Sequence, residues 1–149
     1  MTAIAYRDGV LAADTACFQG DIIGGHDKKI YRLSDGRLYA GAGRCWQIET
    51  VAAWLETQPP SELIFDEDPP NGILVSADGS QVWCLQGKNQ TPWKAPKAEF
   101  HAAGAACEFL SGALAAGAGA EEAVRLAIQY HCFAGGEVVV ERIAGQAPS

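Results

Sequence analysis

The fold is decided by residues 2–14, which read TAIAYRDGVLAAD. Within them, Asp8 and Gly9 separate two short β-prone runs. This pair suits a type I′ turn, because both central residues need positive φ, which Gly tolerates fully and Asp partly. The sequence therefore predicts a hairpin that pairs Thr2–Arg7 with Val10–Ala13.

The register of this hairpin brings a carboxylate to the N-terminus. Counting back from the turn places Ala3 opposite Asp14, so Asp14 lies one step from Thr2. If Met1 is removed, which a small second residue favours, Thr2 carries a hydroxyl nucleophile and an α-amine that can act as its base. An unperturbed α-amine has a pKa of about 7.7–8.0, so a useful fraction is neutral at physiological pH.

A cation for this site is available at the start of the next predicted strand. Lys28 and Lys29 stand side by side there, and strand alternation lets only one of them face Thr2. A nearby cation lowers the pKa of an amine, and a carboxylate such as Asp14 can hold that cation in place. Each residue alone has a plainer interpretation: Asp14 as a turn acceptor, and the two lysines as a solvated edge pair. Only the combination favours catalysis.

Further turns and periodic segments extend the pattern. Asp35-Gly36 and Asp78-Gly79 predict two more hairpins, which pair Lys28–Leu33 with Arg37–Ala42 and Gly72–Ala77 with Gln81–Gln86. Apolar residues at helical spacing predict three helices, over residues 45–57, 106–114 and 120–131. Gly135-Gly136 is expected to turn the chain into a closing strand over residues 137–143.

These elements predict one α+β domain over residues 1–149, in which antiparallel sheets carry helices on their outer faces. Pro59-Pro60 is expected to stop the first helix. Residues 59–70 and 87–96 are expected to be surface loops, and residues 144–149 a frayed tail.

The composition excludes several classes of protein. The 149 residues include 11 basic and 18 acidic side chains, for a net charge of −7, with 48% hydrophobic and 19% charged residues. The low charged fraction excludes a disordered chain, and the acidic balance argues against a nucleic-acid partner. No apolar run reaches the roughly 18 residues needed to span a bilayer, and no signal-peptide pattern follows Met1. We therefore expect a cytoplasmic protein with no membrane partner.

The cysteines give no sign of a metal site. Their number is odd, and none are in a C-x-x-C spacing: Cys17, Cys45, Cys84, Cys107 and Cys132. We expect them to be reduced, buried and structural. A zinc site with His26, His101 or His131 lacks the usual local ligand pairs, so no metal or cofactor is expected.

Four stretches of the chain together resemble the start of proteasome β-type subunits, with the bacterial HslV-type peptidase as the nearest match. They are TAIAYR at 2–7, GVLAAD at 9–14, DKKIYRL at 27–33 and YAGAG at 39–43. Those proteins are N-terminal nucleophile hydrolases with a four-layer αββα sandwich of two antiparallel sheets flanked by helices. The resemblance implies a shortened version of that fold.

The resemblance also implies roles for single residues. The nucleophilic Thr of the family matches Thr2, its Asp at the end of the second strand matches Asp14, and its Lys matches Lys29, the second of the pair. A family glycine that donates a backbone N–H to the oxyanion matches Gly43, with Arg44 following. A plain strand-to-helix turn explains that glycine equally well.

The chain departs from the family in several places. One helix of the family's pair is expected to be lost into residues 59–70, and the first hairpin is shorter than the family norm. A family Ser near the third helix, which supports the nucleophile, corresponds to Ala105. Arg44 replaces a small residue at the rim of the site.

Three functions follow from these observations. The first is a threonine-type peptidase or amidase that acts on peptides or unfolded proteins, as a homo-oligomeric ring with a possible ring ATPase partner, as the resemblance implies. The second is a catalytically inactive scaffold or assembly subunit. The third is a binding module whose ligand face is lined by Trp46, Trp54, Trp83 and Trp93. For Trp46 and Trp54, packing of a helix is the preferred interpretation.

Overall fold

The first hairpin has the register that its turn predicts. In the computed structural model, which describes residues 1–57 and 61–144, strand β1 (Ile4–Arg7) pairs antiparallel with β2 (Val10–Asp14), with Ile4 opposite Ala13. Asp8 and Gly9 have φ of 51° and 79°, as a type I′ turn requires. The short hairpin therefore keeps Asp14 at the N-terminal end of β1.

The other two Asp-Gly pairs form hairpins with longer loops. Leu33 N–H donates to Arg37 C=O across a loop of residues 34–36, and Ser76 N–H donates to Gln81 C=O across a loop of residues 77–80. Only the glycines of these pairs have positive φ. The hairpins themselves are confirmed, but a type I′ turn at these two positions is not formed.

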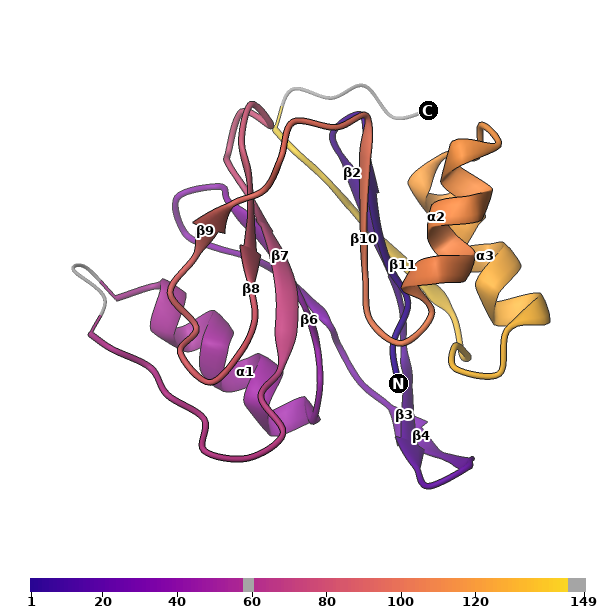
Figure 1. The fold of residues 1–149 in the computed structure, drawn as a ribbon, viewed down its shortest axis with the longest axis horizontal. Helices are drawn as coiled ribbons and strands as arrows, with labels where there is room; N and C mark the ends of the chain where they lie inside the picture. The colour runs from indigo at the N-terminus through magenta and orange to yellow at the C-terminus, as the bar shows by residue number, and fades with distance from the viewer. Residues whose placement is uncertain (58–60, 145–149) are drawn as a thin grey trace.

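The described residues form an α+β structure with three sheets and three helices (Figure 1). A four-stranded sheet has the order β10-β1-β2-β11, with β10 at Phe100–Ala103 and β11 at Val138–Arg142. In the five-stranded sheet the strands lie side by side in sequence order. They are β5 at Ile30–Arg32, β6 at Leu38–Ala42, β7 at Asn71–Val75, β8 at Val82–Leu85 and β9 at Trp93–Lys94. The helices are α1 (Cys45–Leu55), α2 (Cys107–Ala115) and α3 (Ala120–Tyr130).

Three apolar clusters hold these elements together. The first lies between the two larger sheets and includes Ile4 and Leu11 from one and Leu38 and Ile73 from the other. The second joins α2 and α3 to the other face of the four-stranded sheet, and the third joins α1 to the other face of the five-stranded sheet. Figure 1 shows α2 and α3 on one side and α1 on the other. The helices therefore cover outer faces, as the sequence predicts.

Residues 61–70 contain no helix, so α1 packs on its sheet without a second helix from this segment. The Pro59-Pro60 stop signal and the tail from residue 145 lie outside the described residues. The loop expected over residues 87–96 contains the two-residue strand β9.

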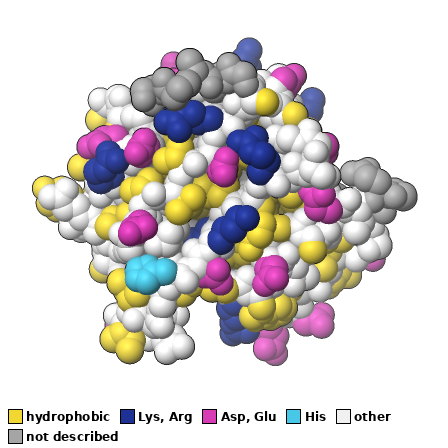
Figure 2. Space-filling view, turned by 180° about the vertical axis from the view of Figure 1, so that it is seen from behind, with side chains coloured by type: hydrophobic (Ala, Val, Ile, Leu, Met, Phe, Trp, Pro, Cys, Tyr) yellow, Lys and Arg dark blue, Asp and Glu magenta, His cyan; other side chains and the backbone are white. Residues whose placement is uncertain are grey.

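A third, two-stranded sheet was not predicted from the sequence. Strands β3 (Ala16–Gln19) and β4 (Ile22–His26) form a hairpin that extends away from the body of the molecule (Figure 1). Ile22 and Ile23 are 67% and 48% exposed, and Figure 2 shows hydrophobic side chains at this projecting end. On the same face, basic and acidic side chains are interspersed.

The cysteines are less buried than expected. All five are free thiols; four are half-buried, and Cys132 is exposed. No helix in the described ranges has the length and apolarity needed to cross a bilayer.

Candidate active site

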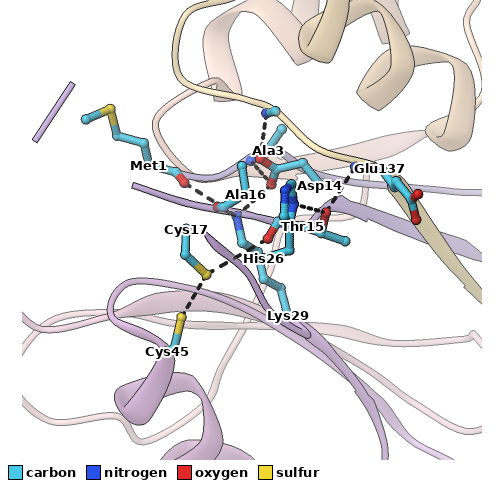
Figure 3. Close-up of polar contacts among 11 residues, drawn as sticks. Met1, Ala3, Asp14, Thr15, Ala16, Cys17, His26, Lys29, Cys45 and Glu137 are labelled. Atoms are coloured by element: carbon cyan, nitrogen blue, oxygen red, sulfur yellow. Dashed lines mark hydrogen bonds and ion pairs between the residues drawn. The ribbon is translucent and has the colours of Figure 1, made fainter. Parts of the chain in front are cut away.

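A buried ion pair lies at the end of β2. Lys29 Nζ is 2.9 Å from Asp14 Oδ1, and the two side chains are 3% and 0% exposed (Figure 3). Lys29 Nζ also donates to the Ala16 carbonyl at 2.7 Å. The Asp14 carboxylate accepts the Ala3 N–H at 3.0 Å through Oδ1 and the Gly135 N–H at 3.1 Å through Oδ2. Both charges are therefore compensated inside the protein.

The structure distinguishes between the two neighbouring lysines. Lys29 is buried and faces Asp14, whereas Lys28 is exposed and lies with Nζ 4.4 Å from the centre of the Tyr31 ring. The alternation of side chains along an extended segment explains why only one reaches the site. The residue facing the N-terminus is the one that the family resemblance implies.

Thr2 lies beside this ion pair, and its hydroxyl is buried. The residue is 1% exposed, and within the described part of the chain Thr2 Oγ1 has no hydrogen-bond partner. The Lys29 ammonium reaches the same place, since its Nζ is 3.5 Å from the carbonyl oxygen of Met1, which precedes Thr2. A buried hydroxyl without a partner is uncommon, and such groups occur where a ligand or reactant completes the site.

The backbone of Thr2 is held by the segment that leads into α2. Ala106 N–H donates to the Thr2 carbonyl at 3.2 Å. Gly104 has φ of +92°, and a Cβ at this position would collide with the Thr2 carbonyl oxygen. A glycine is therefore required both for the backbone conformation and for the close approach to Thr2.

Gly43 lies at the turn from β6 into α1, where a buried side chain fixes the backbone. Its φ is +153°, and a Cβ there would lie 2.9 Å from Gln47 Oε1. Gln47 accepts the Arg44 N–H at 3.0 Å and donates to the Asp68 carbonyl at 2.9 Å. The Arg44 N–H is thus occupied, which leaves the Gly43 N–H as the candidate oxyanion donor of this turn.

These residues meet at a cavity of about 800 Å³. Thr2, Lys29 and Gly43 line the cavity, and Asp14 contacts Lys29 from behind it. All four site residues expected from the sequence therefore lie together. No tryptophan is among the described residues that line the cavity.

The surroundings of the N-terminus lower the pKa of an amine. The pKa of the Met1 α-amine is below its ordinary value, first because burial disfavours the charged form and second because the Lys29 ammonium repels it. Asp14 acts in the opposite direction, but more weakly. We expect an amine on Thr2, exposed by loss of Met1, to be subject to the same two causes.

Ala105 also lines the cavity. The sequence resemblance matched this residue to the supporting Ser of the family, and the methyl group of an alanine offers no hydrogen bond.

Several site residues were missed in the sequence. Gln47 carried a weak signal, since a Gln three residues after a helix start is typical of a capping box, but the preceding cap residue here is Arg44. The Gly135 N–H carried none, because its contact with Asp14 joins residues 121 positions apart.

No protein-family model and no curated protein sequence matches this chain. Solved structures do resemble it. Thiobacillus denitrificans BPH superposes with a TM-score of 0.65 at 17% identity, over 97% of this chain and 99% of its own. The same protein in complex with epoxomicin gives a TM-score of 0.65 at 17% identity, over 96% and 98%. HslV from Trypanosoma brucei gives 0.72 at 17% identity, over 94% and 97%. The expected resemblance is therefore confirmed for the fold: this chain has the fold of HslV/proteasome-type peptidases over nearly its whole length.

Proposed function

We propose that this chain is a threonine-type peptidase, an N-terminal nucleophile hydrolase whose nucleophile is Thr2 after removal of Met1. The observation that carries the proposal is the buried Thr2 hydroxyl, which has no partner among the described residues and shares a cavity with Lys29. The two sheets with helices on their outer faces are assigned to a shortened αββα sandwich, formed by residues 1–149 as a single domain.

The chemistry follows from the groups around Thr2. The α-amine of Thr2, neutral because burial and Lys29 lower its pKa, takes the proton of the hydroxyl as the oxygen attacks a substrate carbonyl. The Gly43 N–H stabilises the oxyanion of the tetrahedral intermediate. The amine then returns the proton to the leaving nitrogen, which leaves an ester on Thr2. Water attacks that ester and releases the free acid and the regenerated hydroxyl.

Asp14 acts through Lys29. Its carboxylate fixes the ammonium beside the N-terminus, and it also binds the Ala3 N–H directly after Thr2. One side chain thus positions both the cation and the nucleophile's backbone.

The substrates in this proposal are peptides and unfolded proteins. The working form is a homo-oligomeric ring in the cytoplasm, with a ring ATPase as its partner. The fold shared with Trypanosoma brucei HslV supports this assignment.

The test begins with the intact mass of the purified protein, which should correspond to a chain that starts at Thr2. Epoxomicin, present in one of the BPH structures, is then offered as a covalent probe. Thr2 should be labelled, and Thr2→Ala should abolish both labelling and peptide hydrolysis without unfolding the chain. Thr50→Ala, an exposed position on α1, serves as the control. Hydrolysis that survives in Thr2→Ala refutes the proposal.

A second candidate function is an inactive scaffold or assembly subunit with the same fold. Ala105 favours it, because the cavity contains a methyl group where the family has a supporting hydroxyl. A retained Met1 would exclude the peptidase and leave this alternative, since Thr2 would then have no free amine. If Met1 is absent and epoxomicin still fails to label Thr2, Ala105→Ser tests whether the missing hydroxyl is the cause.

A further inference from the structure

Two cysteines face each other at the cavity, and the proposed chemistry uses neither. Cys17 on β3 and Cys45, the first residue of α1, have their sulfur atoms 2.9 Å apart (Figure 3). Both side chains line the cavity that also holds Thr2. They are 28 positions apart in the sequence, so the fold brings them together.

The environment gives the two thiols different roles. Burial, the hydrogen bond with Cys17 and the nearby Asp27 carboxylate raise the pKa of Cys45 to about 12. The thiolate form of Cys45 is therefore disfavoured. Cys17 is half-buried at the cavity and can be reached by a small oxidant.

We propose that Cys17 and Cys45 form a redox modification site, in which a hydroperoxide converts the two thiols to a disulfide across the cavity. The Cys17 thiolate attacks the peroxide oxygen, the O–O bond breaks, and the protonated leaving group departs as an alcohol or as water. The Cys17 sulfenic acid is then attacked by the Cys45 sulfur, which forms the S–S bond and releases water. Both thiol protons end in these products, the two sulfurs lose two electrons, and the peroxide gains them.

The cross-link connects two parts of the cavity wall that the sheets leave separate. Strand β3 pairs only with β4 in the described structure, and this hairpin supplies Phe18, Gly24 and Gly25 to the wall. Cys45 follows directly on Gly43 and Arg44. A disulfide would therefore fix the hairpin against the turn that holds the proposed oxyanion donor, and a dithiol would release it.

Modification of this site is tested independently of catalysis. The full-length protein is treated with hydrogen peroxide, its intact mass is measured, and its peptides are mapped without reduction. The mass should fall by two hydrogen atoms, with Cys17 and Cys45 in one cross-linked peptide, and a dithiol should restore it. The midpoint of thermal unfolding should rise on oxidation, because the cross-link restricts the unfolded chain.

Matched variants identify the pair. Cys17→Ser and Cys45→Ser should show neither the cross-link nor the rise in midpoint, whereas Cys84→Ser on β8 should behave as the wild type. Thr2→Ala should form the cross-link as well as the wild type, so a failure of the proposed peptidase function leaves this result unchanged. Free thiols after treatment, sulfinic acid at Cys17 without a cross-link, or cross-links confined to Cys132 between molecules would each overturn the proposal.

Discussion

The Asp14 carboxylate joins three segments of the chain at the candidate site. It binds the Lys29 ammonium, the backbone N–H that follows Thr2 and the Gly135 N–H near the other end of the chain. Because the carboxylate is fully buried, each of these partners compensates the cost of removing its charge from water. Loss of any one partner should affect both stability and the position of the nucleophile.

The buried cation gives a prediction of stability. Lys29→Met removes the partner of a buried carboxylate and should lower the free energy of unfolding by about 3–5 kcal/mol, the usual result of breaking a buried ion pair. Denaturant unfolding measures the change. Lys28→Met, one residue away and exposed, should stay within about 0.5 kcal/mol of the wild type, as surface substitutions do. Equal losses of unfolding free energy in the two variants would show that the buried ion pair does not contribute to stability.

The lowered pKa of the N-terminal amine predicts the pH dependence of Thr2. An amine must be neutral to accept the hydroxyl proton, so reactivity should rise with pH through the pKa of that amine. Burial and Lys29 both lower the pKa of the amine when Met1 carries it. We expect the same direction for the amine of Thr2, so the midpoint of the rise should lie below 8.0, the ordinary value of an N-terminal amine. The rate of covalent labelling of Thr2, followed against pH, gives this midpoint.

Removal of the cation provides the check on this assignment. In Lys29→Met the same midpoint should move to higher pH, because the repulsion that lowers the pKa is gone. A midpoint that is unchanged by Lys29→Met would assign the titration to another group.

At the scale of the elements, the segment between β10 and α2 packs against the backbone of Thr2. Gly104→Ala should displace Thr2 and reduce the rate of its labelling by at least tenfold, because the new methyl group meets the Thr2 carbonyl. Gly87→Ala is the matched control, with φ of +80° and open space around it. Both variants carry the roughly 1–2 kcal/mol cost of an alanine in the left-handed region. Similar labelling rates in the two would mean that the contact with Thr2 is unimportant.

The start of α1 depends on one buried amide. Gln47→Leu keeps the side-chain volume but leaves the Arg44 N–H and the Asp68 carbonyl unpaired, at a cost of about 1–3 kcal/mol. The turn at Gly43 should loosen, and labelling of Thr2 should slow. Thermal unfolding and labelling rates measure the two effects, with exposed Gln129→Leu on α3 as the control. A stable variant with wild-type labelling would exclude Gln47 from positioning this turn.

At the scale of the whole molecule, the projecting β3–β4 hairpin predicts association. Ile22 and Ile23 expose apolar surface at its end, and burying such surface gains about 25 cal/mol per Å². We predict that this hairpin contacts a second copy in the proposed ring. Light scattering should give a mass several times the 15.7 kDa of the chain, and Ile22→Ser with Ile23→Ser should reduce it. A wild-type monomer would remove the ring from the proposal.

The sequence allowed the first hairpin and the placement of Asp14 to be predicted, because both depend on one turn and on counting. It left Lys28 and Lys29 undecided on spacing alone, and only the family resemblance favoured Lys29. The two-stranded β3–β4 sheet escaped prediction, since β4 contains Gly24 and Gly25, which have low strand propensity, and its turn lacks the Asp-Gly pair.

Contacts between distant segments could not be predicted at all. The bond of Gln47 to the Asp68 carbonyl and the meeting of Cys17 with Cys45 depend on how separate elements pack. Such contacts produce no periodic pattern in the sequence, because each residue is paired with one that is distant along the chain and close only after folding.

The contact between Asp14 and the Gly135 N–H has a consequence for biosynthesis. Strand β11, which follows Gly135, pairs with β2 beside Asp14, so this part of the site is supplied by a segment that is synthesised long after the nucleophile. A nascent chain that has displayed only its first hundred residues lacks this partner for the carboxylate. The hydrolytic centre proposed here should therefore be completed only after the segment around Gly135 has been synthesised and has folded against β2.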